Sequence, residues 1–285
     1  MSSYTIAPFE LTDTELEAVA SMLAFTFRKP RMFTAPYLRW LYRDNPDGRA
    51  FGYNAIAPDG SIAAHYCMIP VWFHLNGEVL RAGLGINTAT HPDHEGKWLF
   101  LKVAHKTIAE ATEKGYAFLT GVANQNAEKL CLRLGYQPLA RLDAAIGTGR
   151  SLQLPPANAS FFRYWSQEAF EWRCKNPHHP YTVQTGKQHN NIYCNSLYPL
   201  VNAWLGSVPG HVSPKLDFLS KTKWNPFQLW MGLHPSVNGA PRGFIKIPER
   251  LKPSPLILMM KDLRGDLLPP DKNEILIQPA DFDAF

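Results

Sequence analysis

The stretch HPDHEGKWLFLKV, residues 91–103, decides the fold, because it joins a predicted strand to a predicted helix. Residues 79–90 before it have the pattern of a strand, and the residues after it carry one apolar helical face as far as Lys114. A turn between a strand and a helix is a general anion site, because first-turn amides lack partners and the helix dipole adds positive potential. Gly96 lets a phosphate approach the backbone, whereas Trp98 in the same turn needs an explanation.

Around this turn, the first 150 residues alternate between strand and helix patterns. Periodicity and turn residues predict strands at 4–9, 51–58, 61–73, 79–90, 116–122 and 137–149. They predict helices at 11–27, at 35–48, from the turn to about 114, and at 124–136. This order indicates an α+β fold with a mixed, mostly antiparallel sheet flanked by helices, and one βαβ unit near residues 80–122.

The second half has shorter elements, because proline recurs throughout it. It begins with a linker-like stretch at 155–165 and a helix to about residue 175, followed by predicted strands at 181–186, 226–233, 243–247 and 255–260. One internal echo links the halves: RWLYRDNP (39–46) and EWRCKNP (171–177) each place Trp, a basic residue and Asn-Pro at a helix end. We expect a duplicated unit with an eroded second copy, although chance also produces such matches.

Composition excludes several classes of protein. With 45% hydrophobic and 19% charged residues among 285, the chain is predicted to bury a core rather than remain disordered. The net charge of +5 is not gathered into a dense basic run, so nucleic acid is not expected as a partner. No apolar run reaches the length of a membrane span, and the N-terminus lacks signal-peptide features. We therefore expect a cytoplasmic protein, monomeric or homodimeric, without membrane contact.

The four cysteines, at positions 67, 131, 174 and 194, form no CxxC pair. This spacing predicts neither a zinc site nor a disulfide framework. The thiols are expected to be reduced, and no metal is predicted.

Two motifs on these elements resemble those of the GNAT superfamily of acyl-CoA-dependent N-acyltransferases. TATHPDHEGKWLF (88–100) is similar to the family run V-H-P-D-Y-R-G-K-G at a strand end, and NQNAEKLCLRLGYQPL (124–139) is similar to N-x-x-A-x-x-L-Y-x-x-x-G-F. The resemblance implies a splayed sheet and an acyl-CoA-binding domain over residues 1–150. One branch has two such halves, and the echo and the ending PADFDAF (279–285) resemble it. Residues 151–285 are therefore expected to be a degenerate GNAT-like domain that shapes the acceptor site.

The resemblance also implies the co-substrate, acetyl-CoA or another short-chain acyl-CoA, and the residues that bind it. Its pantetheine is expected along the backbone of Ala89 and Thr90, and Asn124 and Asn126 line the far wall. Its pyrophosphate is expected on the backbone amides of Glu95, Gly96, Lys97, Trp98, Leu99 and Phe100.

Departures from the family pattern fall in the same loop. Glu95 replaces the usual Arg or Gln, and Trp98 and Phe100 replace the two motif glycines. We expect Trp98 to adopt an ordinary negative φ in the first helical turn, so that the site stays intact. We expect Lys97 to supply charge near the phosphates, and Glu95 to point outward, because a carboxylate would repel them.

Catalytic candidates are fewer. His65, on a central strand, is a candidate general base, with a packed core histidine as the alternative. Asn87 and Thr88, late on the strand that faces the cleft, are candidates for binding the acceptor, with purely structural roles as the alternative. Cys131 stands where many family members carry the tyrosine that reprotonates the leaving thiolate. It is a candidate acid, with an inert buried thiol as the alternative.

These residues predict an N-acyltransferase that moves an acyl group from acyl-CoA to a primary amine of a small molecule. An amino sugar on a nucleotide carrier is the specific acceptor expected, held between the halves by aromatic rings such as those of Tyr193, Trp204, Trp224 and Trp230. The alternatives are an aminoacyl-tRNA-dependent transferase of two GNAT-like halves, which should show a basic surface, and a non-catalytic GNAT-like binding protein.

Overall fold

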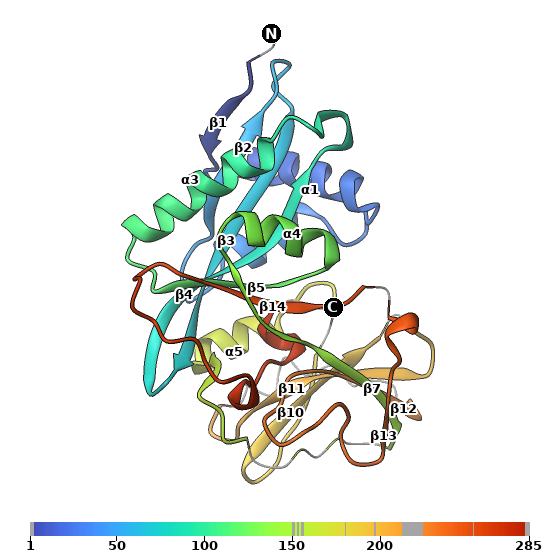
Figure 1. The fold of residues 1–285 in the computed structure, drawn as a ribbon. Helices are drawn as coiled ribbons and strands as arrows, with labels where there is room; N and C mark the ends of the chain where they lie inside the picture. Colours follow the sequence, from blue (N-terminus) through green and yellow to red (C-terminus); the bar gives the residue numbers. More distant parts are fainter. Residues whose placement is uncertain are drawn as a thin grey trace.

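The computed structural model describes residues 3–149, 152, 154, 157–179, 181–196, 198–212, 225–252 and 254–282. These residues form two β-sheets, one above the other in Figure 1, with most of the helices on the first. No helix among them is long and apolar enough to cross a membrane.

The first sheet contains the predicted splayed unit. Its strands, in spatial order, are β1 (Thr5–Pro8), β2 (Phe51–Ile56), β3 (Ile62–Leu75), β4 (Glu78–Thr90), β5 (Phe118–Ala123), β14 (Ile257–Asp262) and β6 (Gln137–Arg141), with β8 (Phe161–Tyr164) paired to β3. Every neighbouring pair is antiparallel except β4 and β5, which are parallel. The mixed, mostly antiparallel sheet and the βαβ unit are confirmed.

Helices cover both faces of this sheet. They are α1 (Asp13–Phe27), α2 (Ala35–Leu38) with the π-helical turn η1 (Arg39–Arg43), α3 (Leu99–Glu113) and α4 (Gln125–Arg133). Alternate residues of β3 face opposite ways: Cys67 and Ile69 pack with α1 and α2, whereas Tyr66 and Met68 pack with α3. Thr12 caps α1 by accepting from the Glu15 amide.

Most strands of the second sheet follow those of the first sheet in the chain, but the two sheets are not built from two separate segments. Its spatial order is β13 (Phe244–Lys246), β7 (Asp143–Thr148), β12 (Phe227–Gly232), β11 (Val201–Pro209), β10 (His189–Asn195) and β9 (Thr182–Gln184), with α5 (Gln167–Cys174) before β9 in the chain. Short 3-10 turns are η2 (Pro92–His94), η4 (Glu249–Leu251), η5 (Lys272–Glu274) and η6 (Pro279–Asp281). The four predicted strands of this half are present, whereas β8, β10 and β11 were not foreseen.

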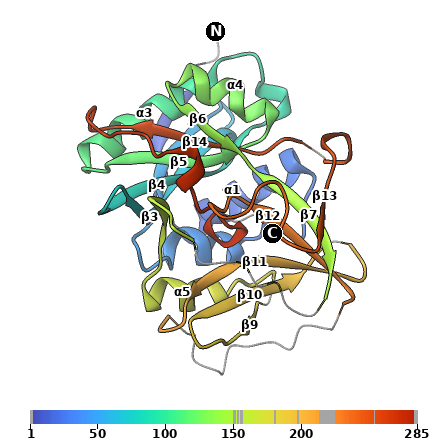
Figure 2. The same cartoon turned by 60° about the horizontal axis from the view of Figure 1, so that its bottom comes forward.

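The two sheets exchange strands. The single strand predicted at 137–149 is wrong: it divides at Leu142 into β6, in the first sheet, and β7, in the second. Conversely, β14 comes from the C-terminal part of the chain and lies between β5 and β6 (Figure 2). The sheets therefore do not separate at the predicted boundary between residues 150 and 151.

The sheets also share one topology. The path β2-β3-β4-β5-β14-β6 and the path β9-β10-β11-β12-β7-β13 have the same succession of senses, with only the third pair parallel. In each, the pairing shifts register where the second and third strands of the path meet. This match supports the expected duplication.

The two segments of the sequence echo contact each other through their tryptophans. Trp40 and Trp172 stack with their ring centroids 5.0 Å apart. The indole Nε1 of each donates to the backbone oxygen of the other, at 2.9 Å in both directions. Reciprocal contacts of this kind are typical of two-fold related units, as the expected duplication would give.

Candidate active site

The parallel strands β4 and β5 separate near their middle. Their pairing runs only from Ala82 and Phe118 to Leu84 and Thr120. Just beyond, a Cβ atom on Gly121 would lie 3.2 Å from the carbonyl oxygen of Gly85, so glycine lets the two backbones lie close together at the point where their pairing ends. From residue 85 to 90, β4 pairs with β3, and no other described strand pairs with its second edge. We call residues 85–90 the free edge of β4.

A bulge interrupts the free edge. His65 pairs with Ala89 but Cys67 pairs with Ile86, so β4 has one extra residue here. Asn87 takes the left-handed conformation at φ +50°, which asparagine tolerates better than most residues. A bulge leaves backbone groups outside the ladder, and these are available to a ligand.

The side chain of Asn87 ends a buried chain of hydrogen bonds. Its Nδ2 donates to the Tyr42 hydroxyl at 2.9 Å, and that hydroxyl lies 3.2 Å from His65 Nε2. His65 Nδ1 lies 2.7 Å from Asn54 Oδ1, and Asn54 Nδ2 donates to Glu15 at 2.9 Å. Because a carboxylate only accepts, every donor in the chain points towards Glu15.

This arrangement determines the protonation state of His65. Burial lowers its pKa to about 3, so the imidazole is neutral near pH 7. Its Nδ1 carries the proton given to Asn54, and its Nε2 accepts from Tyr42, whose pKa burial raises well above the ordinary value. Both ring nitrogens are therefore used. This environment favours the packed-histidine alternative over the role of general base.

Free amides gather at the start of α3. Gly96 has φ +76° and Trp98 has φ +60°, and α3 starts at Leu99 without a side-chain cap. The amides from Gly96 to Phe100 donate to no group among the described residues. Glu95 is different, because its amide donates to the Pro92 oxygen at 3.3 Å. The run of free amides therefore starts at Gly96, one residue later than the predicted run.

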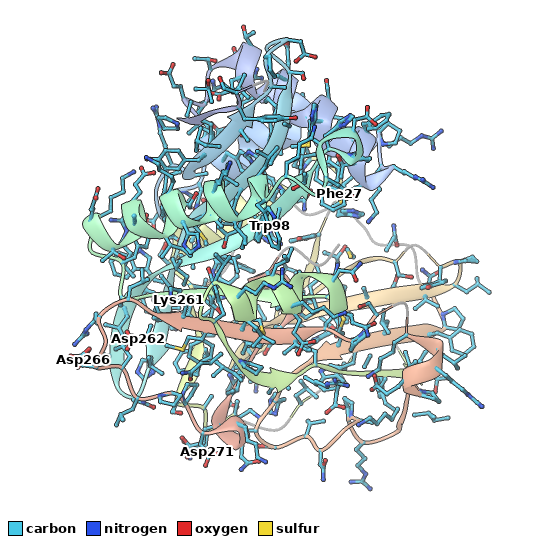
Figure 3. The ribbon with its side chains drawn as sticks, turned by 45° about the horizontal axis from the view of Figure 1, so that its top comes forward. Phe27, Trp98, Lys261, Asp262, Asp266 and Asp271 are labelled. Atoms are coloured by element: carbon cyan, nitrogen blue, oxygen red, sulfur yellow. The ribbon has the colours of Figure 1, made fainter. Side chains whose placement is uncertain are left out.

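Trp98 departs from expectation. It is not in the first helical turn but is the N-cap residue, in the left-handed conformation, so the predicted negative φ is wrong. A positive φ explains why glycine is usual at this position. The side chain is 63% exposed, and the Arg133 guanidinium lies 5.6 Å from its ring centroid. Figure 3 shows Trp98 at the start of α3, beside α4, which carries Arg133.

Of the charged side chains in the loop, Lys97 is placed differently from the prediction. Lys97 donates to the Tyr4 hydroxyl at 2.7 Å and so is held on β1's side of the loop. Glu95 is exposed. Arg133, which the sequence analysis did not single out, is the cation held at Trp98. The contact between Arg133 and Trp98 depends on how α3 and α4 approach each other, and no local sequence pattern indicates that approach.

The remaining predicted residues lie on either side of the opening. Ala89 and Thr90 are on the free edge of β4. Asn124 caps α4, because its Oδ1 accepts from the amides of Asn126 and Ala127, and Asn126 is exposed. Cys131, on α4, is partly buried, and burial raises the pKa of its thiol to about 11.

The aromatic residues expected to hold the acceptor are mostly core residues. Tyr193, Trp204 and Trp230 are buried together in the second half. Trp224 lies outside the described residues. The prediction of an acceptor stacked on the first three is therefore wrong. No group of His, Cys, Asp or Glu in the described ranges is arranged to hold a metal ion.

Comparisons with known proteins point to one domain type. Residues 9–139 match the family model described as acetyltransferase (GNAT) domain. A search of curated protein sequences finds no match. Among solved structures, a GCN5-related N-acetyltransferase from Anabaena variabilis ATCC 29413 superposes with a TM-score of 0.62 at 11% identity, over 92% of this chain and 74% of that one.

Two further structures agree in extent. A probable N-acyltransferase from Enterococcus faecalis V583 gives a TM-score of 0.61 at 9% identity, over 92% of this chain and 73% of that one. A GCN5-related N-acetyltransferase from Kribbella flavida gives 0.61 at 12% identity, over 92% and 72%. At these identities the likeness shows a shared fold, and its extent includes both sheets.

Proposed function

We propose that the protein acylates a primary amine of a small molecule with acyl-CoA as donor, from the premise that residues 9–139 match the model of the acetyltransferase (GNAT) domain. The observation that carries the proposal is the run of free amides from Gly96 to Phe100 beside the free edge of β4. Together they match a donor with an extended pantetheine arm followed by a pyrophosphate.

The donor would use the backbone more than the side chains. Its pantetheine amides would pair with the free edge near Ala89 and Thr90, as an added strand does. Its pyrophosphate would lie on the amides of Gly96–Phe100, with Arg133 supplying a nearby positive charge. Backbone groups released by the bulge at Asn87 would then face the thioester oxygen.

Asn87 would also orient the acceptor. Its Nδ2 is committed to Tyr42, and its Oδ1 has no partner among the described residues. That oxygen can accept from the acceptor amine and direct the nitrogen lone pair at the thioester carbon. Because His65 cannot take the amine proton, we propose that the amine reaches the site neutral or loses its proton to water.

The specific acceptor we propose to test first is an amino sugar on a nucleotide carrier. The support is its negative charge, which suits a chain of net charge +5, and the two-half topology described above. A panel of free amino sugars, nucleotide-linked amino sugars, polyamines and aminoacyl-tRNA, assayed by release of free CoA thiol, would decide among acceptor classes. Turnover only with aminoacyl-tRNA would contradict the small-molecule proposal.

Calorimetric titration of CoA tests the donor site directly. We expect wild type to bind with a Kd in the micromolar range, about −8 kcal/mol. Gly96→Val should lose at least about tenfold in affinity, because a β-branched residue resists φ +76° and would shift the free amides. Gly243→Val is the matched control, since Gly243 has φ +80° in the second half. Equal losses in both variants, or no wild-type binding, would contradict the assignment.

Replacement of Trp98 should separate backbone strain from the side chain. Trp98→Gly and Trp98→Ala both remove the contact with Arg133, but only glycine adopts φ +60° without cost. We expect Trp98→Gly to be more stable than Trp98→Ala by about 1 kcal/mol in urea unfolding. Both should bind CoA as well as wild type or more tightly, since the Trp98 amide is retained. A more stable alanine variant would show that the position has a negative φ.

Removal of the Cys131 thiol should change turnover little. Transfer of a proton from a thiol with a pKa of about 11 to a thiolate of ordinary pKa, near 8.5, is uphill by about 3 kcal/mol. We therefore expect Cys131→Ala and the size-matched Cys131→Ser to keep kcat within about threefold. A tenfold or larger fall in kcat in both variants, with an unchanged Kd for CoA, would restore Cys131 as the acid.

A further inference from the structure

A second site lies away from the free edge of β4. A cavity of about 810 Å³ opens between the end of β3, β8 and the face of β10 and β11. Its volume is within the range of small-molecule sites. None of the residues assigned above to acyl transfer lines it.

The charge of this cavity has one sign. Its lining includes one arginine, one lysine and four histidines (Arg163, Lys187, His74, His189, His211 and His234), and no Asp or Glu among the described residues lines it. Arg163, at the floor, is paired with Asp47 through Nη2 at 3.4 Å, so its charge is partly balanced. Lys187, at the rim, has no ion pair with any described carboxylate. The lining therefore favours an anion.

Several nitrogen atoms of the lining have no hydrogen-bond partner among the described residues. The Oδ1 of Asn191 accepts from the Trp204 indole at 3.2 Å, which leaves the Nδ2 of Asn191 to donate. The Nε of Arg163 is buried and bonds to no described group, and the same holds for the Nδ1 of His74. Buried nitrogens normally have partners, so these two point to a missing ligand or water.

One wall of the cavity is aromatic. Phe162 stacks on His74, with centroids 4.7 Å apart and planes within 14°. Tyr164, two residues further along β8, is 46% exposed and presents a free ring. A planar ring of a ligand can stack on such a surface while an attached anion meets the basic rim.

The cavity is too far from the bulge for one small ligand to occupy both. β4 contributes Val79 to the cavity, whereas the bulge is at Asn87, about 26 Å further along an extended strand. The geometry points to a separate site for a phosphorylated ligand with a planar ring, of the size of a nucleoside monophosphate.

Titration with uridine 5′-monophosphate tests this site. The full chain is first saturated with CoA, so that the amides at α3 are occupied, and uridine and inorganic phosphate serve as half-ligand controls. We expect a Kd of about 100 μM or tighter for the nucleotide, and at least about tenfold weaker binding of each control. The double variant Lys187→Gln, His189→Gln should weaken binding by at least about tenfold, and Tyr164→Ala by about fivefold.

Lys106→Gln, an exposed lysine on α3, is the charge-matched control and should change the Kd less than about twofold. Because Lys187, His189 and Tyr164 are exposed, their variants should fold, which circular dichroism confirms. No binding to wild type at about 10 mM nucleotide, or equal binding to the double variant, would overturn the site. Displacement of the nucleotide by CoA would assign it to the donor site instead. If CoA itself fails to bind, the donor assignment fails, and the same titration still tests the cavity.

Discussion

A chain truncated after Gly149 is expected to remain unfolded, although it contains the whole family-matched segment, residues 9–139. It would lack β14, which fills the place between β5 and β6. The side chains lost include four that are almost fully buried, on both faces of the sheet: Ile257, Leu258, Met259 and Met260. At about 1.5–3 kcal/mol each, their burial equals the whole stability of a typical domain.

Complementation gives this prediction a direct readout. The fragment alone should show no cooperative urea transition, and a peptide spanning residues 254–264 added in trans should restore one. A control peptide with Leu258 and Met259 replaced by Asp should not, because both side chains would be charged inside the core. A fragment that unfolds cooperatively without any peptide would show that the first sheet closes without β14.

Replacement of His65 is expected to remove much of the acid sensitivity of the protein. The folded pKa of His65 is about 3, whereas an unfolded histidine titrates near 6.5. As pH falls below 6.5, the unfolded chain gains a proton that the folded chain cannot take. The stabilising contribution is thus complete above pH 6.5 and is lost towards pH 3, at about 1.4 kcal/mol per pH unit.

His65→Gln keeps a donor and an acceptor but cannot titrate. It should be less stable than wild type at pH 7.5 by about 1–3 kcal/mol, because the contacts with Tyr42 and Asn54 lengthen or shift. As pH falls from 6.5 to 5, its unfolding free energy should decrease less steeply than that of wild type. The difference between the two slopes should correspond to about one bound proton. His105→Gln, an exposed histidine on α3, should leave the wild-type slope unchanged. Parallel curves for wild type and His65→Gln would contradict the buried neutral state.

Prediction from sequence succeeded where structure is local. The turn at 91–98, the helix after it and the parallel return strand follow from periodicity and from one short motif. Prediction failed for strands that are polar and for strands that are exchanged between the two sheets. β10 contains three asparagines and β11 contains Gly206 and Pro209, so neither shows a clear apolar alternation. The division at Leu142 depends on which sheet edge is open, and that is settled by pairing with residues 79 to 123 positions away.

The features of the candidate site likewise divide into those that could be predicted from the sequence and those that could not. Gly96 and the residues after it could be predicted, because the donor contacts backbone atoms whose position a motif implies. The state of His65 could not, because it depends on Tyr42, which the π-helical turn η1 brings beside it. The left-handed conformation of Trp98 was missed because a bulky residue at that φ is uncommon. Tertiary neighbours, rather than residue type, decide these features.

The exchanged strands make the two sheets a single thermodynamic unit. If either sheet melted, it would withdraw a strand from the other and leave an open edge and a gap in its core. The chain should therefore unfold in one transition on heating, although a polypeptide of 285 residues often shows two. By the same linkage, CoA bound beside α3 should raise the melting temperature of the second sheet as much as that of the first.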